Sequence, residues 1–164
     1  MNVNCMSHIA VIKAALPGMT ERKNGQIVNI SSLSGIIGVP VRTMYSASKF
    51  AIRGFANALR AEVKPFGIDV INIYPDYIQT NISNNAMTGS GKAFGKTDEN
   101  IGKGMTVSKC VNQILKSMAM RKFEVIIGRT WTQFIPLIST SSTLMDRLMD
   151  NKYKSQIETK KKAE

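Results

Sequence analysis

Residues 26–35, which read QIVNISSLSG, and residues 45–49, which read YSASK, decide the fold of this chain. The first five of these residues form a short apolar run with the length and β-branched character of a buried parallel strand. The run leads into a loop that carries Ser32, and the segment that opens at Tyr45 has helical periodicity. Because side chains four apart share one face of a helix, we expect Tyr45 and Lys49 to lie one turn from each other.

Ser32, Tyr45 and Lys49 have the side chains that a proton-transfer site needs. The pKa of a free phenol is about 10, and a neighbouring ammonium lowers it, so that proton exchange becomes feasible near neutral pH. A hydroxyl at a strand end can hydrogen-bond a carbonyl oxygen as that oxygen gains charge. Taken alone, a Tyr-x-x-x-Lys pattern is more often an ordinary pair on a helix surface. Other features of the chain must decide between these interpretations.

Helical and strand-like segments alternate along the rest of the chain. Apolar spacing predicts helices over 2–19, from Tyr45 to about Pro65, and over 106–120, with further strands over 68–74 and 123–128. Pro17 and Gly18 mark the expected end region of the first helix. Residues 81–105 are rich in Asn, Ser, Gly and Lys and are expected to form a mobile loop, whereas 131–149 predicts one or two short helices. Such alternation is typical of an α/β fold.

Composition is that of one globular domain, with 164 residues, 43% of them apolar and 20% charged. Cys5 and Cys110 show no disulfide-framework spacing, which suits a reducing, intracellular compartment. No apolar run approaches the ~20 residues that span a bilayer, and the N-terminus lacks the features of a secretory signal. The single histidine, His8, has no acidic neighbour at catalytic spacing, so we expect neither a hydrolase triad nor a metal site.

The net charge of +11 raises the question of an anionic partner. Zinc-finger spacing, RNA-binding aromatic patterns and base-reading basic helices are absent from the sequence, so we expect no nucleic-acid partner. The basic residues cluster only at the end, and we divide the chain into a domain at 1–150 and a basic tail at 151–164. A solvated, frayed tail is expected there. The alternative is weak attraction to a membrane surface, at about 1 kcal/mol per basic residue.

Several motifs together match one family. Tyr45 follows Ser32 by thirteen residues and precedes Lys49 by four, and Asn4 lies twenty-eight residues before Ser32. With these spacings, and with residues 14–19 (AALPGM) and 25–32 (GQIVNISS), the chain resembles the short-chain dehydrogenase/reductase family over essentially all of its length. Within that family, residues 81–86 (NISNNA), after Thr80, look most like the membrane-associated "member 7" group.

The resemblance implies a partial Rossmann-like, doubly wound parallel sheet of about three strands with flanking helices. It also implies an NAD(P)-dependent oxidoreductase that interconverts a carbonyl and an alcohol on a small-molecule substrate. In family terms Tyr45 is the general acid/base, Lys49 lowers its pKa and holds the nicotinamide ribose, and Ser32 orients the substrate oxygen. Asn4 supports a water-linked proton relay. By the same resemblance, residues 81–105 form the substrate lid.

The cofactor, NADP or NAD, is expected to contact Tyr45, Lys49 and the loop after the second strand. That loop matches the family's Pro-Gly-x-x-x-Thr pattern, and its expected cofactor-binding residues are Pro75, Asp76, Ile78 and Thr80. Asp76 stands where the family has glycine. Glycine permits a positive φ and a close backbone approach, whereas aspartate adds an anion near a ligand that bears phosphates.

The resemblance covers only the C-terminal portion of the family's domain. The chain has no glycine-rich strand–turn–helix unit for the pyrophosphate, so we expect cofactor binding to be weakened or lost unless a partner supplies that half. In the family, the helices that correspond to 2–19 and 43–64 commonly form a dimer interface. A homodimer or heterodimer through these helices is therefore expected, and the alternative function is a truncated, non-catalytic interaction module. Association with the endoplasmic reticulum membrane is implied by the family group, without an anchor or signal in this sequence.

Overall fold

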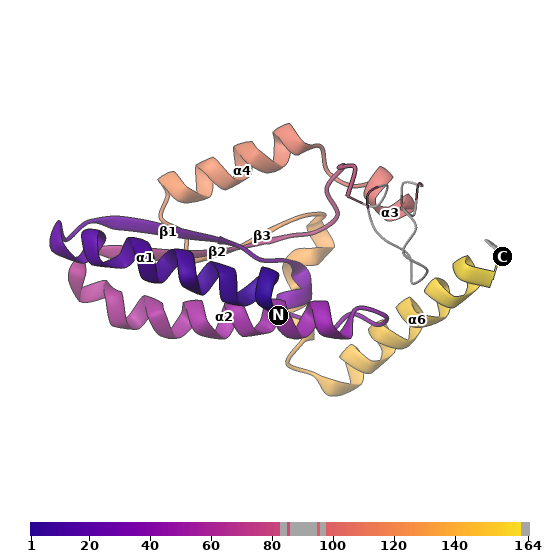
Figure 1. Cartoon of the computed structure of the whole chain (residues 1–164). Helices are drawn as coiled ribbons and strands as arrows, with labels where there is room; N and C mark the ends of the chain where they lie inside the picture. The colour runs from indigo at the N-terminus through magenta and orange to yellow at the C-terminus, as the bar shows by residue number, and fades with distance from the viewer. Residues whose placement is uncertain (83–84, 86–94, 96–97, 162–164) are drawn as a thin grey trace.

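The fold is a three-stranded parallel sheet with helices on both faces (Figure 1). The computed structural model describes residues 1–82, 85, 95 and 98–161. The strands are β1 (Gly25–Ile30), β2 (Ile68–Pro75) and β3 (Glu124–Ile127), in the order β1-β2-β3. The register pairs Ile27 with Val70 and Ile73 with Val125. The predicted α/β architecture with parallel strands is confirmed.

Two long helices cover one face of the sheet and one covers the other (Figure 1). On the first face lie α1 (Ser7–Glu21), which a short π-helical turn at Asn2–Met6 precedes, and α2 (Thr43–Val63). On the opposite face lies α4 (Val107–Ala119). The shorter elements are the 3-10 turns Leu33–Gly35 (η2), Lys64–Phe66 and Thr130–Phe134, and the helices α3 (Glu99–Gly102) and α5 (Ile135–Ile138). The last helix is α6 (Ser142–Lys161).

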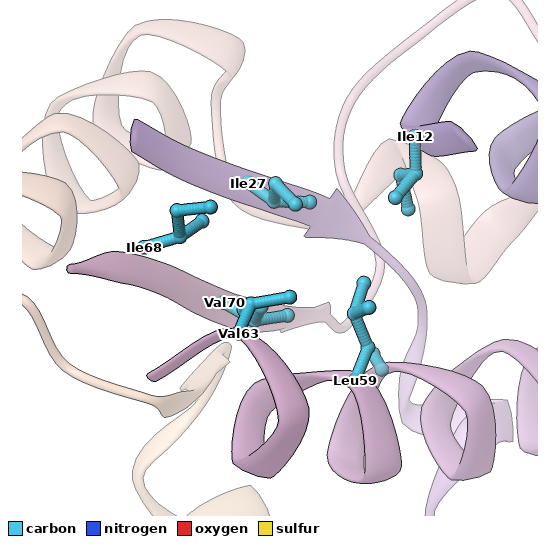
Figure 2. Packing of buried hydrophobic residues seen from close by; sticks show 7 residues of the cluster. Ile12, Ile27, Leu59, Val63, Ile68 and Val70 are labelled. Carbon is cyan, nitrogen blue, oxygen red and sulfur yellow. The ribbon is translucent and has the colours of Figure 1, made fainter. Parts of the chain in front are cut away.

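The central strand β2 is buried on both sides. Its alternate side chains point to opposite faces of the sheet, and both sets pack against neighbouring elements. One set packs against α1 and α2 in the cluster of Figure 2, whose labelled members are Ile12, Ile27, Leu59, Val63, Ile68 and Val70. On the other face Ile71 and Ile73 pack with Cys110 of α4 and Ile127 of β3. A third cluster, around Tyr74 and Ile135, joins the end of β2 to η2 and α5. These contacts fix where each strand ends.

The helix predicted over 2–19 is confirmed to within two residues. It continues through Pro17 to Glu21, because Leu16 and Met19 pack against the core on either side of the proline. The basic tail predicted to fray from residue 151 is instead part of α6 up to Lys161. Met145 and Met149 pack on the cluster around Tyr74, so this helix is anchored at its first turns.

The predicted lid at 81–105 is only partly described. Residues 83–84, 86–94 and 96–97 lie outside the described residues. At the end of the segment, α3 is capped by Asp98, whose carboxylate accepts from the backbone N–H groups of Asn100 and Ile101. Within the described part of the chain, no helix combines the length and apolar character needed to cross a membrane.

Candidate active site

A cleft of about 230 Å³ lies at the carboxyl ends of the three strands. Ser32 and Tyr45 line it on the β1 side. The segment after β2 completes the wall with four of the predicted cofactor residues, Pro75, Asp76, Ile78 and Thr80. In open α/β sheets, ligands bind at this edge because the loops after the strands converge there. The structure therefore brings most of the predicted site residues to one place.

Ser32 reaches the cleft at the point where β1 turns into η2. Its backbone is extended, with φ −164°, and its Oγ accepts a hydrogen bond of 3.2 Å from the backbone N–H of Ser34. This N-cap contact holds the hydroxyl at the start of the turn. The hydroxyl proton of Ser32 is not used in this contact, so it can be donated to an oxygen in the cleft.

Tyr45 and Lys49 stand on successive turns of α2, as the spacing predicted. The Lys49 ammonium lies 5.7 Å from the centroid of the Tyr45 ring and donates to the carbonyl of Ile30 at 3.3 Å. Lys49 is only 8% exposed, and this burial lowers the pKa of its ammonium. An ammonium has three N–H donors, and Ile30 takes one. Among the described residues nothing else is bonded to it, which leaves donors for the tyrosine oxygen and a ligand hydroxyl.

Asn4 lies behind this pair and does not line the cleft. It belongs to the π-helical turn before α1, and its Nδ2 donates to Ser48 Oγ at 3.3 Å. Ser48 Oγ in turn donates to the carbonyl of Tyr45 at 2.7 Å. Asn4 is thus linked to the α2 backbone between the two predicted catalytic residues. Single π turns inside helices often occur at functional sites.

Asp76 is not the free anion that the sequence indicated. Its carboxylate accepts from Arg129 Nε at 3.2 Å, and its side chain is only 8% exposed. The backbone of Asp76 does not have the positive φ for which glycine would be needed. Next to it, a Cβ added at Gly128 would lie 2.7 Å from Asp76 Cβ, so the glycine makes room for the aspartate. The aspartate is therefore accommodated by the two residues that follow β3.

Sequence reasoning missed a second set of cleft residues, which come from four different segments. They are Arg42, Tyr77, Arg129, Trp131 and Lys152. Only Lys152 left a signal in the sequence. It follows Met145 and Met149 at intervals of four and three residues. Residues at this spacing share one face of a helix, which predicts that Lys152 points inward together with the two methionines. The other four lie in loops and turns, where no periodicity applies.

Comparisons with known proteins agree with this geometry. The family model "short chain dehydrogenase" matches residues 1–91. The chain is 37% identical to dehydrogenase/reductase SDR family member 7B of Xenopus laevis, over 98% of this chain and 50% of the relative. It is 43% identical to an SDR family protein 7-like of Drosophila melanogaster, over 78% of this chain and 39% of the relative. The chain spans about half the length of the curated relatives it matches, or less.

Solved structures give the same fold. A short-chain dehydrogenase from Burkholderia cenocepacia, in complex with NADP, has a TM-score of 0.71 at 23% identity, covering 92% of this chain and 56% of that one. Another, from Streptomyces avermitilis, has a TM-score of 0.68 at 23% identity, covering 94% of this chain and 59% of that one. At this level of identity the likeness concerns the fold alone. With the family match and the curated relatives, these findings show that the chain belongs to the short-chain dehydrogenase family.

Proposed function

We propose that this chain carries the proton-transfer chemistry of an NAD(P)-dependent oxidoreductase that interconverts a carbonyl and an alcohol. One observation carries the proposal. Ser32 and Tyr45 line a single cleft, and the buried ammonium of Lys49 stands 5.7 Å from the ring of Tyr45. A phenol beside a buried cation and a strand-end hydroxyl is the set of groups needed to steady a carbonyl oxygen and deliver its proton.

Each residue has a separate role in this proposal. Tyr45 donates its phenolic proton to the substrate oxygen on reduction and takes it back on oxidation. Lys49 stabilises the phenolate that remains, because its positive charge favours the charged form of a neighbouring acid. Ser32 donates a hydrogen bond to the same oxygen. Asn4, through Ser48, holds the turn of α2 that carries the tyrosine, and a water-linked relay from Asn4 to Lys49 restores the proton.

A nicotinamide cofactor supplies the hydride when it is bound. The spare N–H donors of Lys49 suit a ribose hydroxyl, and Pro75, Ile78 and Thr80 line the wall where the nicotinamide half would lie. The Asp76 charge that opposes phosphates is already paired with Arg129. These residues fit the nicotinamide half of either NADP or NAD. The adenosine half finds no glycine-rich unit in this sequence, so we expect weak binding by this chain alone.

The proposal is tested by replacing Tyr45 with phenylalanine in the full chain. Oxidation of NADPH, followed at high cofactor concentration with a panel of ketones and aldehydes, should fall by at least about 100-fold, the usual contribution of a positioned general acid. Far-UV circular dichroism should stay unchanged. The matched control is Tyr153→Phe, because Tyr153 is 48% exposed and does not line the cleft. Turnover that survives in Tyr45→Phe contradicts the assignment.

A second candidate, an interaction module, is favoured by the outer surface of the two long helices. They pack against each other on one side of the sheet. Val11 of α1 and Met44 of α2 are each 69% exposed, and Val3 and Met6, in the turn before α1, are 81% and 55% exposed. Such a surface suits a homodimer or a heterodimer with a relative. Lack of any NADPH fluorescence change, together with a dimer that Val11→Asp disrupts in sedimentation, would favour this reading. The net charge of +11 is consistent with weak attraction to an anionic membrane surface.

A further inference from the structure

The cleft contains more positive than negative charge. Three cations line it, from Arg42, Arg129 and Lys152, against the single carboxylate of Asp76. Arg129 is paired with Asp76 at 3.2 Å. Across the described residues, neither Arg42 nor Lys152 has a carboxylate within ion-pair distance. The Asp98 carboxylate, which caps the start of α3, adds one more negative charge near the cleft and raises the pKa of Lys152. The balance around the cleft is therefore positive.

Lys152 is held at the cleft and does not simply extend into solvent. It lies on the face of α6 that packs inward through Met145 and Met149. Its ammonium is 5.6 Å from the centroid of the Tyr77 ring, a cation–π contact that turns it toward the cleft wall. Burial lowers the pKa of this ammonium, the Asp76 carboxylate raises it, Arg42 and Arg129 lower it further, and Asp98 raises it. Lys152 is half-buried and has no salt bridge to another described residue, so a ligand that supplies the opposite charge would offset the cost of its burial.

Arg42 lines the same cleft as this lysine. It immediately precedes α2, whose first turn carries Tyr45. Burial raises the pKa of Tyr77 and the charge of Arg42 lowers it, so Arg42 acts on the same ring that the Lys152 ammonium contacts. Guanidinium groups bind carboxylate and phosphate in a planar, two-pronged geometry, whereas an ammonium binds them as a point charge.

We propose that Arg42 and Lys152 form an anion-binding site within the cleft, which seats a carboxylate or phosphate group beside Ser32 and Tyr45. The catalytic role of the cleft rests on the proposed function. The anion site itself rests only on the charged residues that line the cleft. The anion has two possible sources, an acidic group on the substrate or the phosphates of the cofactor. In the first case the enzyme would select oxo-acids or phosphorylated carbonyl compounds over neutral ones.

The test is a binding measurement that needs no turnover. Trp131 is the only tryptophan in the chain, lines the cleft and is 44% exposed, so its fluorescence reports on ligands there. The full chain is titrated at fixed ionic strength with 4-oxopentanoate and with 4-oxopentanamide, which have similar shapes and differ in charge. We expect the acid to bind at least tenfold more tightly than the amide. Lys152→Gln and Arg42→Gln should each reduce this ratio to threefold or less.

The matched control is Lys154→Gln, on the same helix but exposed and away from the cleft. Equal affinities for acid and amide, or an equal loss in Lys154→Gln, would overturn the proposal. A final titration with NADP⁺ separates the two sources. Binding of NADP⁺ alongside saturating 4-oxopentanoate assigns the site to the substrate, and mutual exclusion assigns it to the cofactor phosphates. If the acid is still preferred but Tyr45→Phe retains full turnover, the proposed function fails and the anion site stands.

Discussion

Gly35 packs closely between the loop that carries Ser32 and the helix that carries Tyr45 and Lys49. A Cβ added at Gly35 would lie 2.8 Å from the backbone carbonyl oxygen of Lys49 and 2.8 Å from Ser31 Oγ. Carbon and oxygen do not approach so closely without repulsion, and the helix carbonyl cannot rotate away as a flexible side chain can. Gly35→Ala must therefore push η2 and α2 apart by several tenths of an ångström.

Overpacking of this kind costs about 1–3 kcal/mol. For a chain of this length each kcal/mol lowers the melting temperature by about 2–4 °C, so we expect a fall of about 2–12 °C for Gly35→Ala in a circular dichroism melt. Gly38, in the same loop, is the control, because a Cβ there meets nothing within 4 Å. Gly38→Ala should melt at or slightly above the wild-type temperature. An unchanged melt for Gly35→Ala, or equal losses for both variants, would refute this reading of the loop.

Two further predictions concern residues close to the cleft. Val41 has φ +64° and is 56% exposed, and a β-branched residue in this left-handed region costs roughly 1–2 kcal/mol. Val41→Asn should therefore raise the free energy of unfolding by about 1 kcal/mol in urea titrations, whereas the exposed helical control Val11→Asn should not. Burial lowers the pKa of Lys49, so the unfolded chain binds this proton more readily than the folded one. At neutral pH the buried charge of Lys49 therefore lowers the free energy of unfolding. This destabilisation disappears as the pH rises through the lowered pKa toward the ordinary value of 10.5, because the buried lysine loses its proton. The stability advantage of Lys49→Met over wild type should shrink over that interval, and an advantage that is constant with pH would contradict a charged, buried Lys49.

The fold was predictable where a periodic signal was strong. The apolar runs that became β1, β2 and β3 were placed within one or two residues, because each strand contains a cluster of isoleucine and valine that packs into the core. The first helix ends two residues beyond the predicted 2–19, because tertiary packing of Met19 outweighs the local proline signal. The end of α6 was missed for a similar reason. A lysine-rich segment has the composition of a tail, and only its continuation of the Met145–Met149 face indicates a helix.

The site was predictable only where its residues belong to a linear motif. Ser32 and Tyr45 meet at the cleft because a strand end and a helix start were both recognisable, and Lys49 follows by helical spacing. Arg42 and Trp131 reach the same cleft from irregular segments. Their positions depend on how η2 and the turn after β3 fold back over the sheet, which no local pattern in the sequence encodes.

Asp76 illustrates how a departure from a family pattern changes the chemistry around it. A carboxylate that is 8% exposed needs a partner, and Arg129 provides it from the residue two after β3. The same side chain also needs space. Gly128, which lies between β3 and Arg129, leaves that space because it has no Cβ. Because Arg129 is used up in this pair, it cannot bind a ligand anion at full strength. The positive character of the cleft then depends on Arg42 and Lys152, which come from segments outside the family's catalytic motif. The aspartate after β2 thus leaves the cations at the start of α2 and on α6 as the ones available to the proposed anion site.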